Sequence, residues 1–385
     1  MYSASNGLYF HVPYCRSKCH YCGFFSEAQA LSPSLSVWDA WLKEILSCLA
    51  EETQKLDWGL FSTLYIGGGT PSLIPPEVLS SLLQHVQDYL DAEAEITFEA
   101  NPDSLTALTL EILQQFRVTR ISLGIQSFAA HVRQKVGRAV TDSQIQTARE
   151  LLSTWPGDLS LDLIQGLPDQ SLEDCLSDLS TAMSWNVEHL SLYPLSVEKG
   201  TVLYSQLHRG NLKLPQENDA WEKGIEILRH NDWDWYEIAN FARNKAFCQH
   251  NLAYWKQKPY LGIGPGATTT FPRQEKGHKR RVWGQQALGF SLNFDEEYLT
   301  PLEWRKETLM LGLRTSEGIS RQDWKAVSAR NWETVLSRSL ERFASWFVGS
   351  CEGDQLILQP DFRLYQDSFL REAFLDLDVD ARAEV

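Results

Sequence analysis

Apolar and polar positions alternate along the first half of the chain in a pattern typical of strands that are followed by helices. Helical periodicity in the intervening segments predicts helices at 38–52, 76–91, 143–153 and 172–185. Short apolar runs predict six strands, at 8–12, 63–66, 96–98, 120–126, 159–164 and 189–195. Such β-α units predict an α/β fold whose parallel sheet is curled by crossover helices. We therefore expect an open (β/α)6 barrel, a partial relative of the eight-fold TIM barrel.

The second half of the chain loses this alternation after about residue 207. Helical patterns at 218–231 and 300–313 and a hairpin-like stretch at 355–364 predict a smaller accessory α+β domain. The expected division is therefore a barrel over residues 1–206 and a C-terminal domain over residues 207–385. The acidic end, 376–385, is expected to be frayed.

Composition excludes some partners and indicates a compartment. A net charge of −15 argues against general nucleic-acid binding. A local basic cluster, formed by Arg273, Lys276, His278 and 279–281, is interpreted as a solvated loop. The first residues carry no basic and apolar signal sequence, and no apolar run is long enough to span a membrane, although peripheral membrane contact stays open. Seven unevenly grouped cysteines do not form a disulfide framework, so we expect a cytoplasmic protein.

Three of these cysteines, Cys15, Cys19 and Cys22, form a C-x3-C-x2-C run after the first predicted strand. The spacing places three thiolates on one short loop, where they could hold three irons of a cubic iron–sulfur cluster. Because Phe24 stands where a fourth thiol could follow, one iron would have no protein ligand and could bind another molecule. A structural zinc site, which needs four closed ligands, is the alternative from the residues alone.

Glycine and polar motifs follow the apolar runs, at the strand ends where barrels of this kind place their active sites. The run 67–70, Gly-Gly-Gly-Thr, lets backbone amides approach a ligand, although an ordinary turn is the alternative. Glu99 follows the third run, where an acid could bind an ammonium group or a ribose diol, or simply be solvated. Gln126 ends the fourth run, and Arg138 beyond it could form a bidentate pair with a carboxylate. Asp162, inside the fifth run, needs a defined partner.

The cysteine run and the order of these motifs resemble the radical S-adenosylmethionine (radical SAM) superfamily. The resemblance implies one [4Fe–4S] cluster on Cys15, Cys19 and Cys22, whose open iron is chelated by the amino and carboxylate groups of S-adenosylmethionine (SAM). Reduction of such a cluster cleaves SAM and releases a 5′-deoxyadenosyl radical. The resemblance also implies that the following residues contact SAM: Tyr9, Tyr21, Gly68, Gly69, Thr70, Glu99, Gln126, Arg138, Asp162 and Ser196.

Within this superfamily the segments 122–128 and 162–168 resemble the oxygen-independent coproporphyrinogen III oxidases and their relatives. The oxidases carry a further cysteine where this chain has Phe24. The HemW family of haem chaperones lacks that cysteine and carries a His-Asn-x-x-Tyr-Trp motif, present here as 250–255. The resemblance therefore implies a HemW-like protein that binds haem and delivers it to a haemoprotein, which the sequence does not identify. The alternative is an oxidase that decarboxylates coproporphyrinogen III to protoporphyrinogen IX, so enzymatic activity stays open.

His250 and Cys248 are the candidate haem ligands under this resemblance. From the residues alone, without this resemblance, we would expect His250 and Asn251 to stabilise a domain junction through hydrogen bonds. Thr268 and Val140 stand where relatives tend to carry histidine, which puts porphyrin handling or radical turnover in question.

Overall fold

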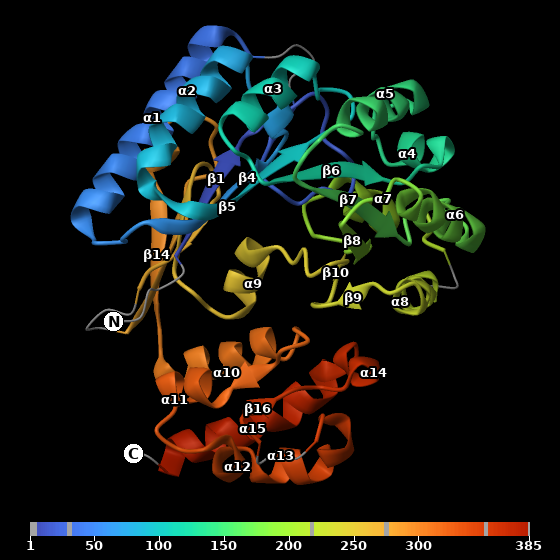
Figure 1. The fold of residues 1–385 in the computed structure, drawn as a ribbon. Helices are drawn as coiled ribbons and strands as arrows, with labels where there is room; N and C mark the ends of the chain where they lie inside the picture. Colours follow the sequence, from blue (N-terminus) through green and yellow to red (C-terminus); the bar gives the residue numbers. More distant parts are fainter. Residues whose placement is uncertain (1–5, 29–32, 216–218, 273–276, 350–352, 384–385) are drawn as a thin grey trace.

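A curved twelve-stranded sheet forms the centre of the structure (Figure 1), a computed structural model that describes residues 6–28, 33–215, 219–272, 277–349 and 353–383. All six strands expected from the apolar runs are present, and each pairs in parallel with its neighbour. They are β1 (Gly7–Val12), β4 (Phe61–Gly68), β5 (Leu90–Ala100), β6 (Arg120–Gln126), β7 (Asp158–Gln165) and β8 (His189–Pro194). The predicted α/β fold with a parallel sheet is thereby confirmed.

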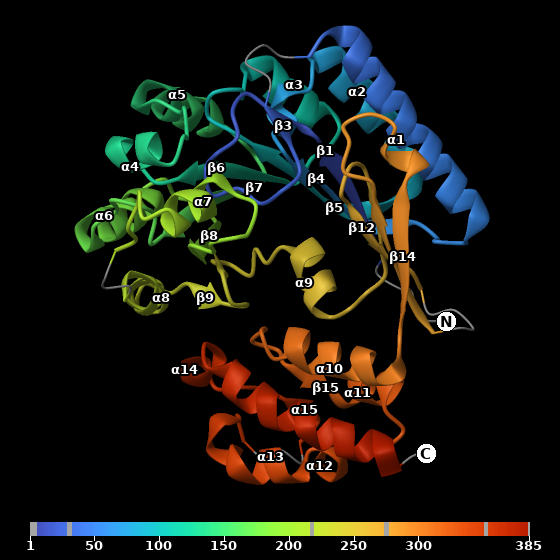
Figure 2. The same cartoon turned by 180° about the vertical axis from the view of Figure 1, so that it is seen from behind.

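Crossover helices cover the outer face of this sheet (Figures 1 and 2). The four predicted helices are present, and the three short helices α3, α4 and α7 were missed. The helices of this half are α1 (Leu35–Lys55), α2 (Pro76–Val86), α3 (Ala107–Gln115), α4 (Ala130–Lys135), α5 (Asp142–Leu152), α6 (Leu172–Met183) and α7 (Val202–His208). Capping boxes at Thr141 and Ser171 fix the starts of α5 and α6. Because helices cover one face and the barrel interior covers the other, strands such as β1 are buried on both faces.

The sheet continues beyond residue 206. Strand β11 pairs in parallel with β1 at one side, and β10 pairs antiparallel with β8 at the other. The added strands are β9 (Asp234–Trp235), β10 (Asn240–Ala242), β11 (Tyr260–Ile263), β12 (Thr268–Thr270), β13 (His278–Trp283) and β14 (Phe294–Leu299). The division between residues 206 and 207 therefore stays a prediction. Within the described part of the chain, the outermost strands β14 and β9 are not paired with each other, so the sheet is open.

Two helices accompany these strands. Helix α8 (Ala220–His230) packs beside β8 and β9. Helix α9 (Gln249–Trp255) lies on the inner side of the sheet, between the strands and the C-terminal helices (Figures 1 and 2).

The C-terminal helices have a hydrophobic core of their own, which includes Trp324, Trp332 and Phe369. The elements of this layer are α10 (Pro301–Gly312), β15 (Ile319–Ser320), α11 (Arg321–Val327), α12 (Trp332–Val335), α13 (Ser337–Arg342), β16 (Gln355–Leu356), α14 (Pro360–Arg363) and α15 (Gln366–Ala383). The hairpin expected at 355–364 is wrong, because β16 pairs with the distant β15 and Pro360 starts a helix.

The expectation of a frayed C-terminus is also wrong for residues 376–383. Helix α15 buries Leu377 completely. Asp380 is buried as well, 3.2 Å from Arg305 and in an ion pair with Arg330. The acidic residues of this helix are therefore partners for basic side chains of the same layer.

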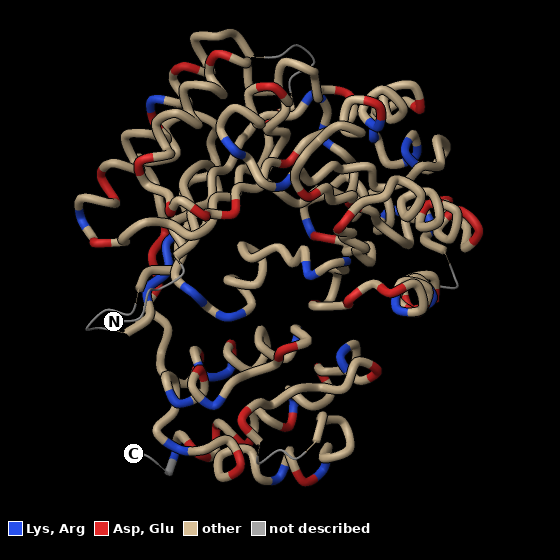
Figure 3. Tube along the Cα trace, in the orientation of Figure 1, with Lys and Arg blue, Asp and Glu red and all other residues tan. Residues whose placement is uncertain are grey.

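The basic cluster is a strand, where a loop had been expected. Residues 278–283 form β13, and Arg280 and Arg281 lie 2.8 Å from the carboxylates of Glu307 and Glu52. Arg273 and Lys276 lie outside the described residues. Elsewhere basic and acidic residues are spread along the chain in both the barrel and the C-terminal helices (Figure 3). None of the helices in the described ranges has the length and apolar character needed to cross a membrane.

Candidate cofactor site

A cavity of about 380 Å³ opens at the carboxyl ends of the parallel strands. It collects residues from the loop after β1 and from the ends of β4 to β8. Most of the residues expected to hold the cluster and SAM line this cavity: Cys15, Cys19, Cys22, Tyr21, Gly68, Gly69, Thr70, Glu99, Gln126, Arg138, Asp162 and Ser196. The structure thus brings together side chains that lie far apart in the sequence.

The cysteine loop is fixed at both ends by backbone contacts. Its first residues form β2 (Tyr14–Cys15), which pairs with β3 (Glu27–Ala28). In the middle, the amide of His20 donates to the carbonyl of Val136 at 2.9 Å. A Cβ on Gly137 would lie 2.8 Å from Nε2 of His20, and the φ of Gly137 is +70°, so only glycine lets this loop approach so closely.

The donor set of this loop fits a cubic cluster with one open iron. Burial raises the pKa of both Cys15 and Cys22, and the neighbouring thiol of Cys19 raises it further. No three His, Cys, Asp or Glu side chains of the described residues converge on a single metal ion. A cubic cluster does not need such convergence, because each thiolate binds a different iron. A closed zinc site would need a fourth ligand, which the exposed Phe24 does not supply.

The glycine run at the end of β4 packs against the cysteine loop. A Cβ on Gly69 would lie 2.7 Å from the carbonyl oxygen of Tyr14, and one on Gly68, whose φ is +109°, would lie 2.7 Å from the ring of His11. Beyond it, the hydroxyl of Thr70 is 3.5 Å from Sγ of Cys15. The glycines therefore allow the strand end to pack closely enough to place Thr70 beside a cluster cysteine.

Glu99 presents a carboxyl group to the cavity from the end of β5. The hydroxyl of Tyr65 donates to it at 2.8 Å, and the amide of Gly68 donates at 3.1 Å. Burial nevertheless raises the pKa of Glu99 to about 7. The site therefore holds an acid that gains or loses a proton near neutrality, and a bound cation would favour the ionised form.

Arg138 has donors available for a ligand. Its Nη2 donates to Asn101 Oδ1 at 2.8 Å and to the carbonyl of Gly124, and its Nη1 is 3.9 Å from Sγ of Cys19. Its Nε is buried and has no hydrogen-bond partner in the described part of the chain. A buried guanidinium with a donor to spare, close to the cluster cysteines, is suited to a carboxylate.

Asp162 and Gln126 complete the polar wall. Both carboxylate oxygens of Asp162 accept from the hydroxyl of Ser122 at 3.0 Å, and burial raises the pKa of this acid. Gln126 has a φ of +70°, a conformation that non-glycine residues rarely adopt. It lies at the point where the pairing register between β6 and β7 shifts. Such strain is often held at a ligand site. Beyond β8, the exposed Ser196 lines the cavity.

The cavity also contains residues that the sequence interpretation missed. Asn101 holds Arg138, Ser122 holds Asp162, and Tyr193 projects into the cavity from the end of β8. Asn101 lies three residues after the third predicted strand and Ser122 lies within the fourth, so their closeness to these strands was the available signal. Of the two departures from the family pattern, Val140 lines this cavity, and Thr268 belongs to β12.

Tyr9 is not among the cavity residues. Its hydroxyl lies 3.0 Å from Nδ1 of His11, and its ring lies against those of Tyr65 and His250. Tyr65 is the residue that reaches Glu99. In this structure Tyr9 therefore supports the wall of the site from behind.

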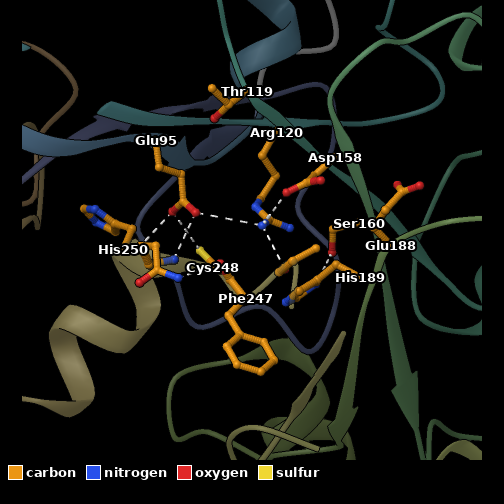
Figure 4. Close-up of polar contacts among 12 residues, drawn as sticks. Glu95, Thr119, Arg120, Asp158, Ser160, Glu188, His189, Phe247, Cys248 and His250 are labelled. Carbon is orange, nitrogen blue, oxygen red and sulfur yellow. Dashed lines mark hydrogen bonds and ion pairs between the residues drawn. The ribbon is translucent and has the colours of Figure 1, made fainter. Parts of the chain in front are cut away.

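The candidate haem ligands His250 and Cys248 lie in the barrel floor (Figure 4). Both ring nitrogens of His250 are used, Nδ1 at 2.7 Å from the hydroxyl of Thr63 and Nε2 at 2.7 Å from that of Tyr254. His250 is 1% exposed, and burial lowers its pKa to about 3. Burial also raises the pKa of the Cys248 thiol, which lies 3.6 Å from Glu95. Neither side chain offers a free ligand atom in this conformation, so their haem role stays a prediction.

A buried ion-pair network holds this floor in place (Figure 4). Glu95 on β5 accepts from the amides of Gln249 and His250, both at 3.0 Å, at the start of α9. Arg120 lies 3.8 Å from Glu95 and donates to Asp158 at 2.9 Å. The side chain of Arg120 is 3% exposed, so the pair is shielded from water. The network thereby connects β5, β6 and β7 to α9, the helix that carries the His-Asn-x-x-Tyr-Trp motif.

Comparison with known proteins agrees with this site. Residues 9–181 match the radical SAM superfamily. A haem chaperone HemW of Lactococcus lactis subsp. lactis is 33% identical over 83% of this chain and 84% of that protein. Another, of Synechocystis sp., is 30% identical over 98% of both chains. The mitochondrial radical S-adenosyl methionine domain-containing protein 1 of Bos taurus is 34% identical over 83% of this chain and 75% of that protein.

A solved structure shows the same fold. Coproporphyrinogen III oxidase (HemN) of Escherichia coli superimposes with a TM-score of 0.77 over 98% of this chain and 91% of that one, at 18% identity. At this identity the match shows the architecture alone. The relatives above, at 30–34% identity, extend over 83% or more of the chain. The chain therefore belongs to the radical SAM superfamily and, within it, to the HemW family.

Proposed function

We propose that this protein is a haem chaperone that holds one [4Fe–4S] cluster and one SAM in its cavity and delivers haem to a haemoprotein. The observation that supports it most directly is the identity of 30–34% to relatives, several of them named haem chaperone HemW, over 83% or more of the chain. A reducing compartment suits three unpaired thiols. Some relatives carry mitochondrial names, and a cytoplasmic site is the proposal for this chain.

Different residues of the cavity would hold the cluster and SAM. Cys15, Cys19 and Cys22 would bind three irons, and the free donors of Arg138 would bind the carboxylate of SAM. The backbone beside Gly68 and Gly69 and the carboxyl group of Glu99 would receive its amino group and ribose. When bound and reduced, the cluster together with SAM supplies a 5′-deoxyadenosyl radical. Asp162, held by Ser122, and Arg138, held by Asn101, would keep SAM in one orientation.

The competing function is oxidative decarboxylation of coproporphyrinogen III. The fold match to HemN does not distinguish the two functions, and Phe24 in place of a further cysteine favours the chaperone. The test is anaerobic incubation of the reconstituted, reduced protein with SAM and coproporphyrinogen III, and separately a titration with hemin followed by addition of an apo-cytochrome b. We expect an unchanged tetrapyrrole in the first experiment, and saturable hemin binding with transfer in the second. Protoporphyrinogen formed in step with 5′-deoxyadenosine would make the protein an oxidase.

The affinity for SAM is expected to depend on pH through Glu99. Its pKa of about 7 means that the carboxyl group binds a proton as the pH falls through that value, and a neutral acid attracts an ammonium group less. SAM affinity will therefore fall between about pH 8 and pH 6 in the wild-type protein. Glu99→Gln, neutral at every pH, will bind about tenfold more weakly at pH 8 and lose this dependence. Equilibrium dialysis measures both. The control is Glu93→Gln, at an exposed position of the same strand, and a wild-type affinity that does not change with pH would contradict the assignment.

A further inference from the structure

Two aromatic side chains at the cavity are exposed without an evident structural role. Phe24 lines the cavity and is 70% exposed, and Tyr193 lines it from the end of β8 and is 39% exposed. Large apolar groups that gather around a concave site in an unliganded protein commonly mark a binding surface. Single exposed side chains elsewhere on the molecule, such as Leu35, carry no such meaning.

Both rings belong to one continuous rim. A Cβ on Gly23 would lie 1.8 Å from Oε2 of Glu198, so the segment that ends in Phe24 lies directly against the segment after β8. Tyr193 lies near the end of β8, just before that second segment. Three aliphatic side chains line the same cavity: Val140, Ile164 and Leu195.

The cysteine loop contributes two basic side chains to this rim, which also carries the acidic Glu198 and Asp103. Arg16 and Lys18 both line the cavity and are exposed. Arg16 lies 3.4 Å from Asp103, whereas Lys18 has no ion pair with any described residue. An unpaired ammonium group beside exposed aromatic rings suits a ligand with a flat apolar face and a peripheral carboxylate.

The size of the cavity decides where such a ligand lies. A volume of about 380 Å³ is near the lower end of the range for small-molecule pockets, about 300–1,000 Å³. SAM would fill it, and a macrocycle would have to lie across the rim. A ligand in that position would also close the cofactor off from water.

We propose that the rim formed by Phe24, Tyr193 and Lys18 binds one face of a tetrapyrrole, with the two rings against the macrocycle and Lys18 beside a propionate. The inference rests on the proposed function and adds the location, because it assigns haem to the mouth of the cofactor cavity. His250, which is buried in the floor with both nitrogens bonded, is then a structural residue in the haem-bound protein.

The experiment is a spectroscopic titration of the reconstituted, full-length protein with hemin. We expect Phe24→Ala and Tyr193→Ala each to raise the Kd about tenfold. Lys18→Gln should raise it about threefold, with less effect at high salt. Leu35→Ala, which removes an apolar side chain that is 51% exposed on α1, is the matched control and should leave the Kd unchanged. Iron content is measured for each variant, and Tyr193→Ala tests the rim from outside the cysteine loop if Phe24→Ala disturbs the cluster.

The outcomes separate the location from the function. Wild-type protein that binds no hemin would overturn both proposals. Hemin binding by the wild-type protein that Phe24→Ala, Tyr193→Ala and Lys18→Gln leave unchanged would overturn the rim alone. A loss of hemin binding confined to His250→Ala would place the haem at α9, also against this inference.

Discussion

Cys19→Ala will remove the cluster and leave the fold intact. A cubic cluster holds about four irons, and three thiolates are its only ligands from this loop, so the loss of one will lower the iron content of the reconstituted protein to below about one per chain. The broad visible absorbance will disappear, and SAM will lose its iron contact. Cys19 lies in a loop at the cavity and outside the hydrophobic cores, so the circular dichroism spectrum should not change. Metal analysis, visible absorbance and SAM dialysis measure these effects.

Cys48→Ala is the matched control for this experiment. It also removes one thiol, but from the buried face of α1 and away from the cavity, where burial raises the pKa of the thiol to about 12. The control should retain about four irons per chain. Full iron content in Cys19→Ala, or zinc in place of iron in the wild-type protein, would refute the ligand assignment.

The elements of the barrel could be predicted because their signals are local. Each of the six parallel strands is a short apolar run, and the longer crossover helices have their own periodicity, so six strands and four helices followed from the sequence. The location of the site could be predicted for the same reason. Parallel strands place their carboxyl ends at one edge, so motifs such as Gly68 and Asp162 had to meet there once the strands were known.

The remaining features depend on contacts between distant segments. Strand β11 has few residues, and only its pairing with β1 makes it part of the central sheet. The family resemblance implies a SAM contact for Tyr9, which stays a prediction, whereas the structure places its ring beside Tyr65 and His250. The ring of His250 is bonded to Thr63, a residue that is 187 positions away in the sequence. No local pattern distinguishes such a buried histidine from an available ligand.

The second large expected effect is a loss of stability in Arg120→Met, a variant that removes the central residue of the buried ion-pair network in the barrel floor. Arg120 is buried between Glu95 and Asp158, and its removal leaves the largely buried Glu95 and the partly exposed Asp158 without their cation. Breaking a buried ion pair at one partner costs about 3–5 kcal/mol of unfolding free energy. Glu95→Gln should cost a similar amount, because it also weakens the acceptor for the amides of Gln249 and His250. Urea unfolding measures both variants.

A local measurement separates this anchoring of α9 from a general loss of stability. Hydrogen exchange at residues 249–255 should accelerate more in Glu95→Gln than in Arg342→Met, which breaks the exposed ion pair with Glu372 and should cost less than about 1 kcal/mol. The double variant Glu95→Gln/Arg120→Met should lose less than the sum of the single losses, because the two groups share one interaction. Additive losses, or unchanged exchange in α9, would show that the pair does not hold the motif helix. The burial of His250 would then depend on its own hydrogen bonds to Thr63 and Tyr254.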